Sequence, residues 1–347
     1  MKKAINVLRS ALWPLNLIYG GIVWVRNTQY DLGYREIYQS KAEIISIGNI
    51  STGGTGKTPM AEYMIRSYLE AGETHVAYLS RGYGRKTKGL LKVNPAEGTA
   101  VEFGDEALQI AARFPAIPVV VCEDRKTGIQ WLEREEKAKV IIMDDAFQHR
   151  KVSRNIDVVV IDATRMPDKD LLLPAGNLRE PARSLHRADF IIVNKVESVD
   201  LIAGLRQRLQ KWNKPLFFCR PVIDRFVFPG GTQNPETGSR VVLFSGIGNA
   251  GSFVSLVETA GYEVAESVDF RDHHYYHKAE VEALVNEFRE MDAGFLFTTE
   301  KDYWRLRGSE AYQALEGVPW GYIQIRLEWW EKSPGENVKV ERSGLPQ

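Results

Sequence analysis

Cysteine is scarce in this chain of 347 residues: Cys122 and Cys219 are the only two, far apart in the sequence and in no metal-ligand spacing. The scarcity excludes a disulfide framework and a cysteine-based zinc site, so we expect two reduced thiols. Net charge is absent too, because 45 basic residues balance 45 acidic ones. A chain without a basic excess carries no global sign of nucleic-acid binding. Its length and a hydrophobic content of 44% predict a globular protein with room for two domains.

A convincing membrane-spanning run is also lacking at the N-terminus. The apolar, aromatic stretch at residues 11–25 is short for a span, is interrupted by Pro14, and is followed by no small-residue cleavage site of a signal peptide. Its aromatic residues and flanking cations instead indicate a helix that lies in the membrane interface, on an anionic surface. A buried first helix is the alternative interpretation.

One glycine-rich loop stands out. Residues 45–59 read ISIGNISTGGTGKTP, which is an apolar strand, a glycine-rich turn and the start of a helix. Such a turn collects backbone N–H groups at the positive end of a helix dipole and suits a polyphosphate. The predicted nucleotide-binding residues are Ser51, Thr52, Gly53, Gly54, Thr55, Gly56, Lys57 and Thr58. Lys57 would contact the β- and γ-phosphates, and the Thr58 hydroxyl would contact Mg²⁺.

The match to this P-loop motif has one departure. Ser51 stands where the first glycine belongs, and a serine serves there if its φ stays negative. An ordinary glycine-rich turn is the alternative, but the flanking strand and helix favour a nucleoside triphosphate site.

Short apolar strands alternate with helices after this loop. We expect strands at 75–80, 117–122, 139–145, 157–163 and 189–195, and helices at 106–114 and 126–136. Strands of this kind, separated by helices, are typical of a parallel sheet covered on both faces. The sequence therefore predicts an α/β fold: a doubly wound, mostly parallel P-loop sheet with an N-terminal membrane-interface helix.

A division of the chain is expected near residues 215–240, where strand-like runs give way to a loop rich in Gly, Pro, Asn and Thr. We predict a membrane-associated segment at 1–40 and a nucleotide-binding domain at 41–220 that is rejoined by 321–347. A second, smaller α/β domain at 221–320 would be attached through a two-strand linker.

Two acids end one of the buried strands. Asp144 and Asp145 follow KVIIM, where a P-loop protein keeps the carboxylate that orders Mg²⁺, so with Thr58 they are the metal-side candidates. A strand-end acid is often only a helix cap, but its place after a P-loop favours the metal role. Gln148 and His149 follow at the same edge. His149 is equally compatible with a ligand contact and with a surface histidine.

Phosphate transfer to an alcohol also needs a carboxylate or imidazole near the attacking hydroxyl. Asp105 and Glu106 stand at a helix start, where capping is the alternative role. The string DFRDHHYYH (269–277) clusters His273 with two further histidines. No cysteine or HExxH pattern supports zinc there. We expect an acid-base role for these groups, acting across the cleft between the two domains.

Two strings suggest other nucleotide proteins. GIGNAG (246–251) matches the dinucleotide-binding pattern, which is weak evidence when it occurs alone. NKVE (194–197) is close to the guanine-reading NKxD of GTPases, but Glu197 is one methylene longer than the usual aspartate. No DxxG switch follows a strand, so a GTPase is disfavoured.

The order of several strings is specific to one family. They are GNISTGGTGKTP, SRGYGR, GDEA, EDR, DDAFQHR, PAGNLREP, FSGIGN, DHH and TTEKD. Over roughly residues 1–305 the chain resembles the tetraacyldisaccharide 4'-kinases, the lipid A 4'-kinases of Gram-negative bacteria. The resemblance implies a two-lobed enzyme that transfers the ATP γ-phosphate to the 4'-hydroxyl of a lipid A disaccharide precursor. It also implies a place at the cytoplasmic face of the inner membrane. The sequence itself gives no sign of an obligate protein partner.

Residue roles follow from the matching strings. Lys57 and Thr58 fall on the phosphate and Mg²⁺ positions, and Asp105 and His273 fall on an acid-base pair for the sugar hydroxyl. Further substrate-side candidates are Arg81, Arg125, Gln148, His149, Asn177, Arg179 and Glu180. The chain departs from the family's pattern at two positions: Ala146 stands where the family often has Gly, and Ala250 stands where it often has Pro.

The sequence thus predicts an ATP- and Mg²⁺-dependent lipid kinase. Lys57 and the loop amides would hold the phosphates. Asp105, oriented or assisted by His273, would take the hydroxyl proton, although the sequence does not fix which of the two residues accepts it. A P-loop GTPase or metallochaperone-like switch is the first alternative. A non-catalytic, membrane-bound nucleotide sensor is the second.

Overall fold

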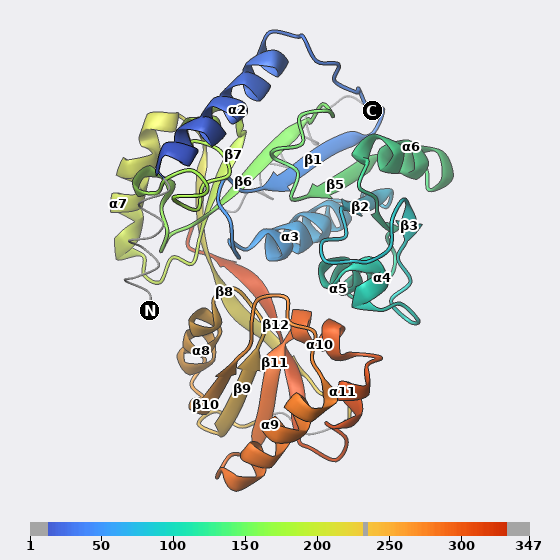
Figure 1. Cartoon of the computed structure of the whole chain (residues 1–347), viewed down its shortest axis with the longest axis vertical. Helices are drawn as coiled ribbons and strands as arrows, with labels where there is room; N and C mark the ends of the chain where they lie inside the picture. The colour runs from blue at the N-terminus through green and yellow to red at the C-terminus, as the bar shows by residue number, and fades with distance from the viewer. Residues whose placement is uncertain (1–12, 232–234, 332–347) are drawn as a thin grey trace. The chain divides into compact units, whose positions relative to one another are not determined.

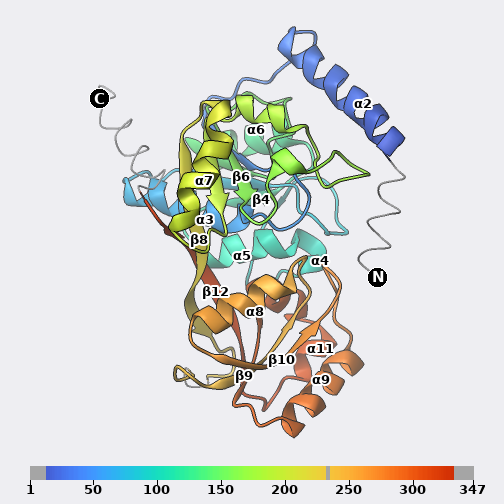
Figure 2. The ribbon, with the colours of Figure 1, turned by 90° about the vertical axis from the view of Figure 1, so that its left-hand side faces the viewer.

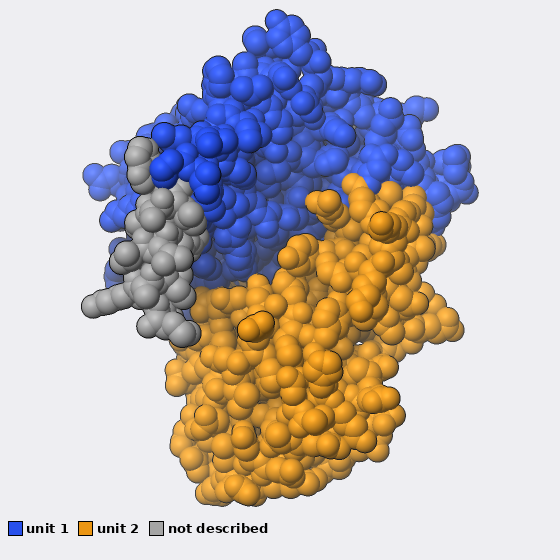
Figure 3. Space-filling model, viewed as in Figure 1, with its two compact units in different colours: residues 1–79, 124–220, 328–347 blue, residues 80–123, 221–327 orange. Residues whose placement is uncertain are grey.

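The computed structural model describes residues 13–231 and 235–331. The chain forms two compact units, shown in two colours in Figure 3. Unit 1 comprises residues 1–79, 124–220 and 328–347, and unit 2 comprises residues 80–123 and 221–327. Each unit has its own run of parallel strands and its own helices.

Unit 1 is built on a parallel sheet with the strand order β8-β7-β6-β1-β5-β2. Its strands are β1 (Glu43–Gly48), β2 (Val76–Ser80), β5 (Val140–Asp144), β6 (Ile156–Asp162), β7 (Phe190–Asn194) and the first part of β8 (Leu216–Val227). Residues of these strands are almost all buried, which is why the sequence shows continuous apolar runs there rather than alternation.

Helices flank this sheet (Figure 1). They are α3 (Lys57–Glu70), α6 (Arg125–Glu135) and α7 (Asp200–Leu209), with short 3₁₀ turns η1 (Pro167–Lys169), η2 (Ala182–Arg187) and η3 (Gln210–Trp212), whereas α2 (Trp13–Asp31) does not cover the sheet (Figure 2). Helix α3 contacts β1 and β5, and α7 places Ile202 and Leu205 in the same apolar cluster as Ile191 and Val193 of β7. The alternation of strands and covering helices confirms the predicted α/β class.

Helix α2 runs along the outside of unit 1 (Figure 2). Tyr19 donates its hydroxyl to the Arg179 carbonyl at 2.9 Å, and Asn16 donates to the Leu172 carbonyl at 3.0 Å. Only part of the helix is covered by these contacts, and a set of large apolar side chains stays exposed: Leu15, Leu17, Ile18, Ile22, Trp24 and Val25. In the described part of the chain, no helix combines the length and the apolar character needed to cross a membrane.

Unit 2 contains a second parallel sheet with the order β10-β9-β11-β12 and a small antiparallel pair, β3 and β4. The strands are β3 (Leu91–Lys92), β4 (Val119–Val121), β9 (Arg240–Ser245), β10 (Glu263–Asp269), β11 (Phe295–Thr299) and β12 (Trp320–Trp329), whose last two residues belong to unit 1. The helices are α4 (Ala100–Phe103), α5 (Asp105–Arg113), α8 (Ala250–Thr259), α9 (Lys278–Glu290), α10 (Glu300–Leu306) and α11 (Glu310–Gln313).

Strand β9 shows how the sheet of unit 2 is covered on both faces. Val241 and Leu243 belong to the apolar cluster that contains α8, whereas Val242 and Phe244 belong to the cluster that contains α9. Successive strand residues point to opposite faces, so four consecutive apolar residues require a helix on each side. The second α/β domain expected from the sequence has this architecture.

Residues 80–123 differ from the sequence-based division, which placed them in the nucleotide-binding domain. They belong to unit 2 because α5 packs against α10. Arg113 of α5 and Glu300 of α10 form an ion pair, with side chains only 6% and 5% exposed. The two residues are 187 positions apart in the sequence, so no local pattern reveals the contact.

The carboxyl ends of four parallel strands meet at one edge of the sheet of unit 1. Strand β1 ends at Gly48, β5 at Asp144, β6 at Asp162 and β7 at Asn194. The registers pair Ile47 with Asp144 and Asp162 with Asn194, and β6 runs three residues beyond Val159, the partner of Gly48. Open parallel sheets bind ligands outside the carboxyl ends of their strands. This edge therefore positions the candidate residues of unit 1.

Candidate functional site

The glycine-rich loop follows β1 and ends where α3 begins. Gly56 precedes the helix with a φ of 101°, and no side chain caps the helix N-terminus. The first N–H groups of a helix have no partner within it, so this end of α3 presents donors together with the positive end of its dipole. Ser51 is not among the residues with positive φ, as its side chain requires. The loop has the geometry of an anion-binding cradle.

Two consecutive side chains at the end of β7 brace this loop. Asn194 donates its amide to the Thr55 carbonyl at 2.9 Å, and the Lys195 ammonium donates to the Gly54 carbonyl at 2.9 Å. Lys195 also pairs with Asp162 at 2.8 Å. These are the first two residues of the NKVE string, so in this structure the string serves to hold the phosphate-binding loop.

Lys57, the first residue of α3, faces a carboxylate and a second cation. Its Nζ lies 3.5 Å from Asp145 Oδ1, and Arg179 Nη1 donates to both Asp145 oxygens at 2.9 Å. Burial would raise the pKa of Asp145, but the cations of Lys57 and Arg179 outweigh it and hold that pKa below its usual range. With its side chain 38% exposed, Asp145 is an ionised and accessible carboxylate.

Asp144 has a different environment, although it is the adjacent residue. It is 1% exposed; Tyr78 donates its hydroxyl to Oδ2 at 2.9 Å, and the Asp145 amide donates to Oδ1 at 2.9 Å. Arg125, a substrate-side candidate, is itself buried and donates to the Asp144 carbonyl at 3.0 Å. The strand end therefore presents one fixed, buried carboxylate and one accessible carboxylate.

These oxygen donors fit a hard cation that is shared with a phosphate. Among residues 13–231 and 235–331, no group of three or more His, Cys, Asp or Glu residues is arranged to hold a metal alone. Mg²⁺ is usually bound through one or two carboxylates together with phosphate oxygens and water, and it does not need such a cage. The Thr58 hydroxyl and the Asp144 and Asp145 carboxylates supply oxygen donors of the required type.

Glu180, predicted on the substrate side, is placed inside unit 1. It has no exposed surface. Its carboxylate is bound by Arg26 at 3.1 Å, Asn27 at 3.0 Å and Arg187 at 3.0 Å. Because Arg26 and Asn27 belong to α2, Glu180 ties this helix to the rest of the unit.

The remaining unit 1 candidates lie around the loop. Gln148 donates to the Asn49 carbonyl at 2.8 Å, and the Asn177 carbonyl accepts from the Thr52 amide at 2.8 Å. His149 is partly buried, and burial together with nearby cations, Arg125 first, lowers its pKa to about 4. His149 is therefore a neutral imidazole near pH 7.

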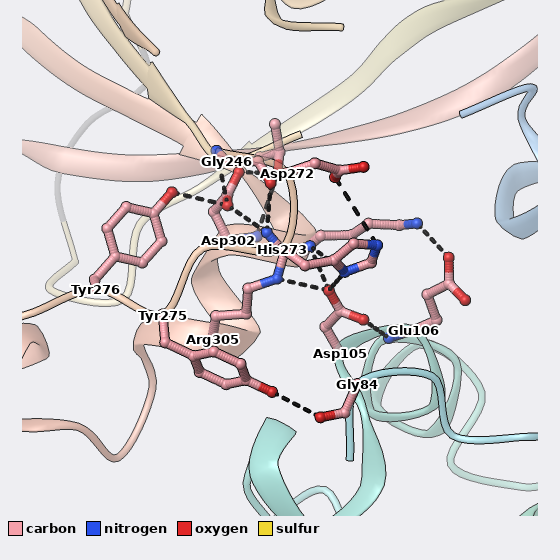
Figure 4. A network of polar contacts seen from close by, with 12 residues as sticks. Gly84, Asp105, Glu106, Gly246, Asp272, His273, Tyr275, Tyr276, Asp302 and Arg305 are labelled. Carbon is pink, nitrogen blue, oxygen red and sulfur yellow. Dashed lines mark hydrogen bonds and ion pairs between the residues drawn. The ribbon is translucent and has the colours of Figure 1, made fainter. Parts of the chain in front are cut away.

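A second cluster of candidate residues lies in unit 2, around the start of α5 (Figure 4). Asp105 is the first residue of that helix, and its side chain is 4% exposed. Arg305 of α10 donates from Nε to Asp105 Oδ2 at 2.7 Å, and the Glu106 amide donates to Oδ1 at 2.8 Å. Burial would raise the pKa of Asp105, but the Arg305 guanidinium outweighs it and holds that pKa well below its usual range.

His273 lies beside this carboxylate. Its Nδ1 is 3.7 Å from Asp105 Oδ2, its Nε2 is 3.9 Å from Asp272 Oδ1, and its side chain is 33% exposed. The backbone of His273 adopts a left-handed φ of 59°, and the ring of Tyr83 packs against its ring at 4.7 Å between centroids. The expectation that Asp105 and His273 belong to different domains is wrong, because both are in unit 2.

Arg305 and Asp302 were not identified from the sequence. Asp302 is fully buried and accepts from the Tyr276 hydroxyl at 2.8 Å, from the Gly246 amide at 3.0 Å and from Arg305 at 2.9 Å. Gly246 begins the GIGNAG string, which matches the dinucleotide-binding pattern. Its amide donates to Asp302 and is therefore not available to bind a phosphate. The available signal was the acid that ends the TTEKD string, Asp302, with an arginine three residues later on the same helix. Of the other candidates in this unit, Arg81 is exposed just after β2.

The parallel sheet, the glycine-rich loop and the acids at the neighbouring strand end define unit 1 as a P-loop fold of the nucleotide-binding class. The chain also matches the model of the family described as Tetraacyldisaccharide-1-P 4'-kinase over residues 8–340. It therefore belongs to this family.

Individual relatives agree with this assignment. The chain is 38% identical over 304 residues to the tetraacyldisaccharide 4'-kinase of Chlorobaculum parvum, covering 85% of this chain and 83% of the relative. It is 36% identical over 343 residues to that of Chlorobaculum tepidum, covering 96% of each. The fold is similar to a crystal structure of LpxK from Aquifex aeolicus in complex with ATP, with a TM-score of 0.75 and 30% identity, covering 96% of this chain and 99% of that one. These comparisons confirm the resemblance and the kinase class, and they do not support a GTPase.

Proposed function

We propose that this protein transfers the γ-phosphate of ATP to the 4'-hydroxyl of a tetraacyldisaccharide 1-phosphate, a lipid A precursor. The observation that carries the proposal is the pairing of Asp105 with His273 in a chain that also has a P-loop. A nucleotide switch needs only the loop, whereas a kinase also needs a group that handles the proton of the acceptor hydroxyl.

The P-loop supplies the phosphate contacts in this proposal. Lys57 and the amides at the start of α3 would hold the β- and γ-phosphates, and Arg179 would add a second cation close by. Asp145, poised between these two cations, keeps the Lys57 ammonium in place before the nucleotide arrives.

Mg²⁺ would be held by Thr58 and by the Asp144 and Asp145 carboxylates. When bound, it would neutralise charge on the phosphates as the phosphoryl group is transferred. The buried Asp144, whose two oxygens accept from Tyr78 and the Asp145 amide, is oriented before the ion binds. Gln148, His149 and Asn177, which lie around the loop, remain candidates for contacts with the acceptor, as does Arg81.

Asp105 and His273 would act on the acceptor hydroxyl. Asp105 is ionised and almost inaccessible, whereas one third of the His273 side chain is exposed. Both groups can favour removal of the hydroxyl proton, the imidazole by direct contact and the carboxylate by stabilising the charge that the imidazole gains.

Helix α2 would dock the enzyme on an anionic membrane surface, where the lipid acceptor resides. Four of its exposed apolar side chains, Leu15, Ile18, Ile22 and Val25, recur every three or four residues, a spacing that places them on one face of the helix. We place the protein at the cytoplasmic face of a bacterial inner membrane, because ATP and the lipid precursor meet there.

The deciding experiment is a transfer assay with tetraacyldisaccharide 1-phosphate, Mg²⁺ and either ATP or GTP. Phosphorylation of the lipid with ATP is expected, and Lys57→Ala should lower it by at least about 10²-fold. The exposed Lys278, on α9, is a control, and Lys278→Ala should retain turnover. Nucleotide hydrolysis that is independent of the lipid, or a preference for GTP, would reject the proposal.

A further inference from the structure

Arg305 is the centre of the polar network in unit 2 (Figure 4). Its guanidinium donates to Asp105 Oδ2 from Nε at 2.7 Å and pairs with the same oxygen through Nη2 at 2.5 Å. Nη1 donates to Asp302 Oδ1 at 2.9 Å and to the Gly246 carbonyl at 2.7 Å. Nη2 also lies 3.3 Å from His273 Nδ1. One side chain thus contacts both members of the proposed acid-base pair.

The orientation of Arg305 is itself fixed by a second buried acid. Asp302 stands one helical turn earlier on α10, and its side chain is fully buried. The hydroxyls of Tyr276 and Thr299 donate to it at 2.8 Å and 2.6 Å. Asp302 therefore holds one edge of the guanidinium, and the other edge is presented to Asp105 and His273.

Stability alone is a weak explanation for this arrangement. Both the Arg305 and the Asp105 side chains are almost inaccessible, at 2% and 4%. Buried ion pairs lose much of their attraction to desolvation, and apolar replacements of similar volume are often at least as stable. The network ends at His273, whose side chain is partly exposed, so a role in orienting the groups around that imidazole explains the network better.

We propose that Arg305 is a positioning residue for phosphate transfer, which fixes the Asp105 carboxylate against the ring of His273. The inference rests on the proposed function. Arg305 touches neither substrate in this proposal; it acts through Asp105. Asp302 acts one step further away, by orienting Arg305.

Other charged groups around Asp105 determine how large the effect of Arg305 is. The titratable and charged side chains that face Asp105 from the packed elements are Glu106, Asp272, His273, Tyr275, Lys301, Asp302 and Arg305. Lys301 is the other cation among them, and its ammonium is paired with Glu106 at 2.5 Å. Lys301 remains when Arg305 is replaced, so the carboxylate loses most, but not all, of its cationic surroundings.

The test compares Arg305→Gln with a matched control in the same pair of helices. Arg113→Gln also removes a buried arginine that bridges α5 and α10, but Arg113 pairs with Glu300 and is not part of the network around Asp105. Both variants should lose stability. Only Arg305→Gln should move the acid limb of the kcat profile upward by about one pH unit, because the Asp105 carboxylate then binds a proton more readily. Arg305→Lys, which restores the charge without the planar fork, should give an intermediate profile.

A second measurement separates this inference from the proposed function. The carboxyl carbon of Asp105, assigned with Asp105→Asn, is followed by NMR as the pH is lowered, in wild type and in each variant. We expect its titration to move upward by about one unit or more in Arg305→Gln and to stay in place in Arg113→Gln. If this shift is observed but the wild type does not phosphorylate the lipid, the proposed function is rejected while the effect of Arg305 on the Asp105 carboxylate stands.

Two outcomes would overturn the inference. One is an Arg305→Gln enzyme whose kcat, pH profile and Asp105 titration match those of Arg113→Gln, since Arg305 would then be a structural ion pair only. The other outcome concerns Arg305→Lys and decides the matter if Arg305→Gln does not fold. A wild-type kcat and an unchanged acid limb of the pH profile in Arg305→Lys would show that the guanidinium geometry has no role.

Discussion

The side-chain amide of Asn194 lies directly against the backbone of Gly56. A Cβ built on Gly56 would meet Asn194 Nδ2 at 2.1 Å, and the same amide donates to the Thr55 carbonyl at 2.9 Å. The last residue of β7 thus determines how the phosphate-binding loop enters α3. Gly56 has to be a glycine for two independent reasons, its φ of 101° and this close approach.

We therefore predict that Gly56→Ala weakens ATP binding by at least about tenfold, because the loop must move away from Asn194 and abandon its left-handed turn. Gly204→Ala, on α7 and outside the loop, is the control: no heavy atom lies within 4 Å of its Cβ position, and its φ is not left-handed. Calorimetric titration with ATP measures both. Equal affinities for the two variants would contradict this account of the loop.

Asp105 and His273 are expected to act as one unit. Asp105→Ala and His273→Ala should each lower kcat by about 10²-fold, and the double variant should lose little more, because losses within a catalytic unit are not additive. ATP binding should survive in all three, since neither residue is in the P-loop. Steady-state kinetics with the lipid acceptor measure this; losses that multiply in the double variant would assign the two residues independent roles.

His149 makes stability depend on pH in a defined window. Its pKa in the folded protein is about 4, below the ordinary value of about 6.5, so the unfolded chain binds more protons between these values. The free energy of unfolding should therefore fall as the pH is lowered from 7 to 5. His149→Gln should reduce that fall by an amount of the order of 1 kcal/mol.

Urea unfolding at pH 7 and pH 5 measures this effect. His186→Gln, at an exposed histidine, is the control and should leave the fall in stability unchanged. The prediction fails if the wild type and His149→Gln lose the same stability over this interval.

Helix α2 is expected to bind membranes through its exposed apolar face. Ile18 and Ile22 are 62% and 63% exposed, so charging them leaves the buried contacts of the helix intact. The double variant Ile18→Glu/Ile22→Glu should bind anionic vesicles at least about tenfold more weakly, with ATP affinity unchanged.

A matched substitution is available on another helix of unit 1. Leu201 of α7 is 49% exposed, and Leu201→Glu adds the same charge outside α2. Vesicle co-sedimentation should show wild-type binding for this control. Unaltered binding of the α2 variant would mean that its apolar face has another partner.

The strands, helices and P-loop were predictable because each depends on residues that are close in the sequence. The apolar run at residues 139–145 became β5, the pattern at 106–114 became α5, and the loop before Lys57 adopted its expected place between β1 and α3. Periodicity, glycine content and strand-end acids act over a few residues, so they are readable without a structure.

Contacts between distant residues decided the rest. Arg305 and Asp105 are 200 positions apart, and Arg113 and Glu300 are 187 apart, so only packing of α5 against α10 could assign residues 80–123 to unit 2 and build the network around His273. Glu180 is a further example of a contact that the sequence does not reveal. Its motif predicted a substrate contact, whereas in the structure its buried carboxylate pairs with Arg26 of α2 and with Arg187. The sequence by itself determined the class of fold and the chemistry of the loop. Tertiary structure decided which charges are buried together, because desolvation and pairing depend on distances in space that the order of residues does not contain.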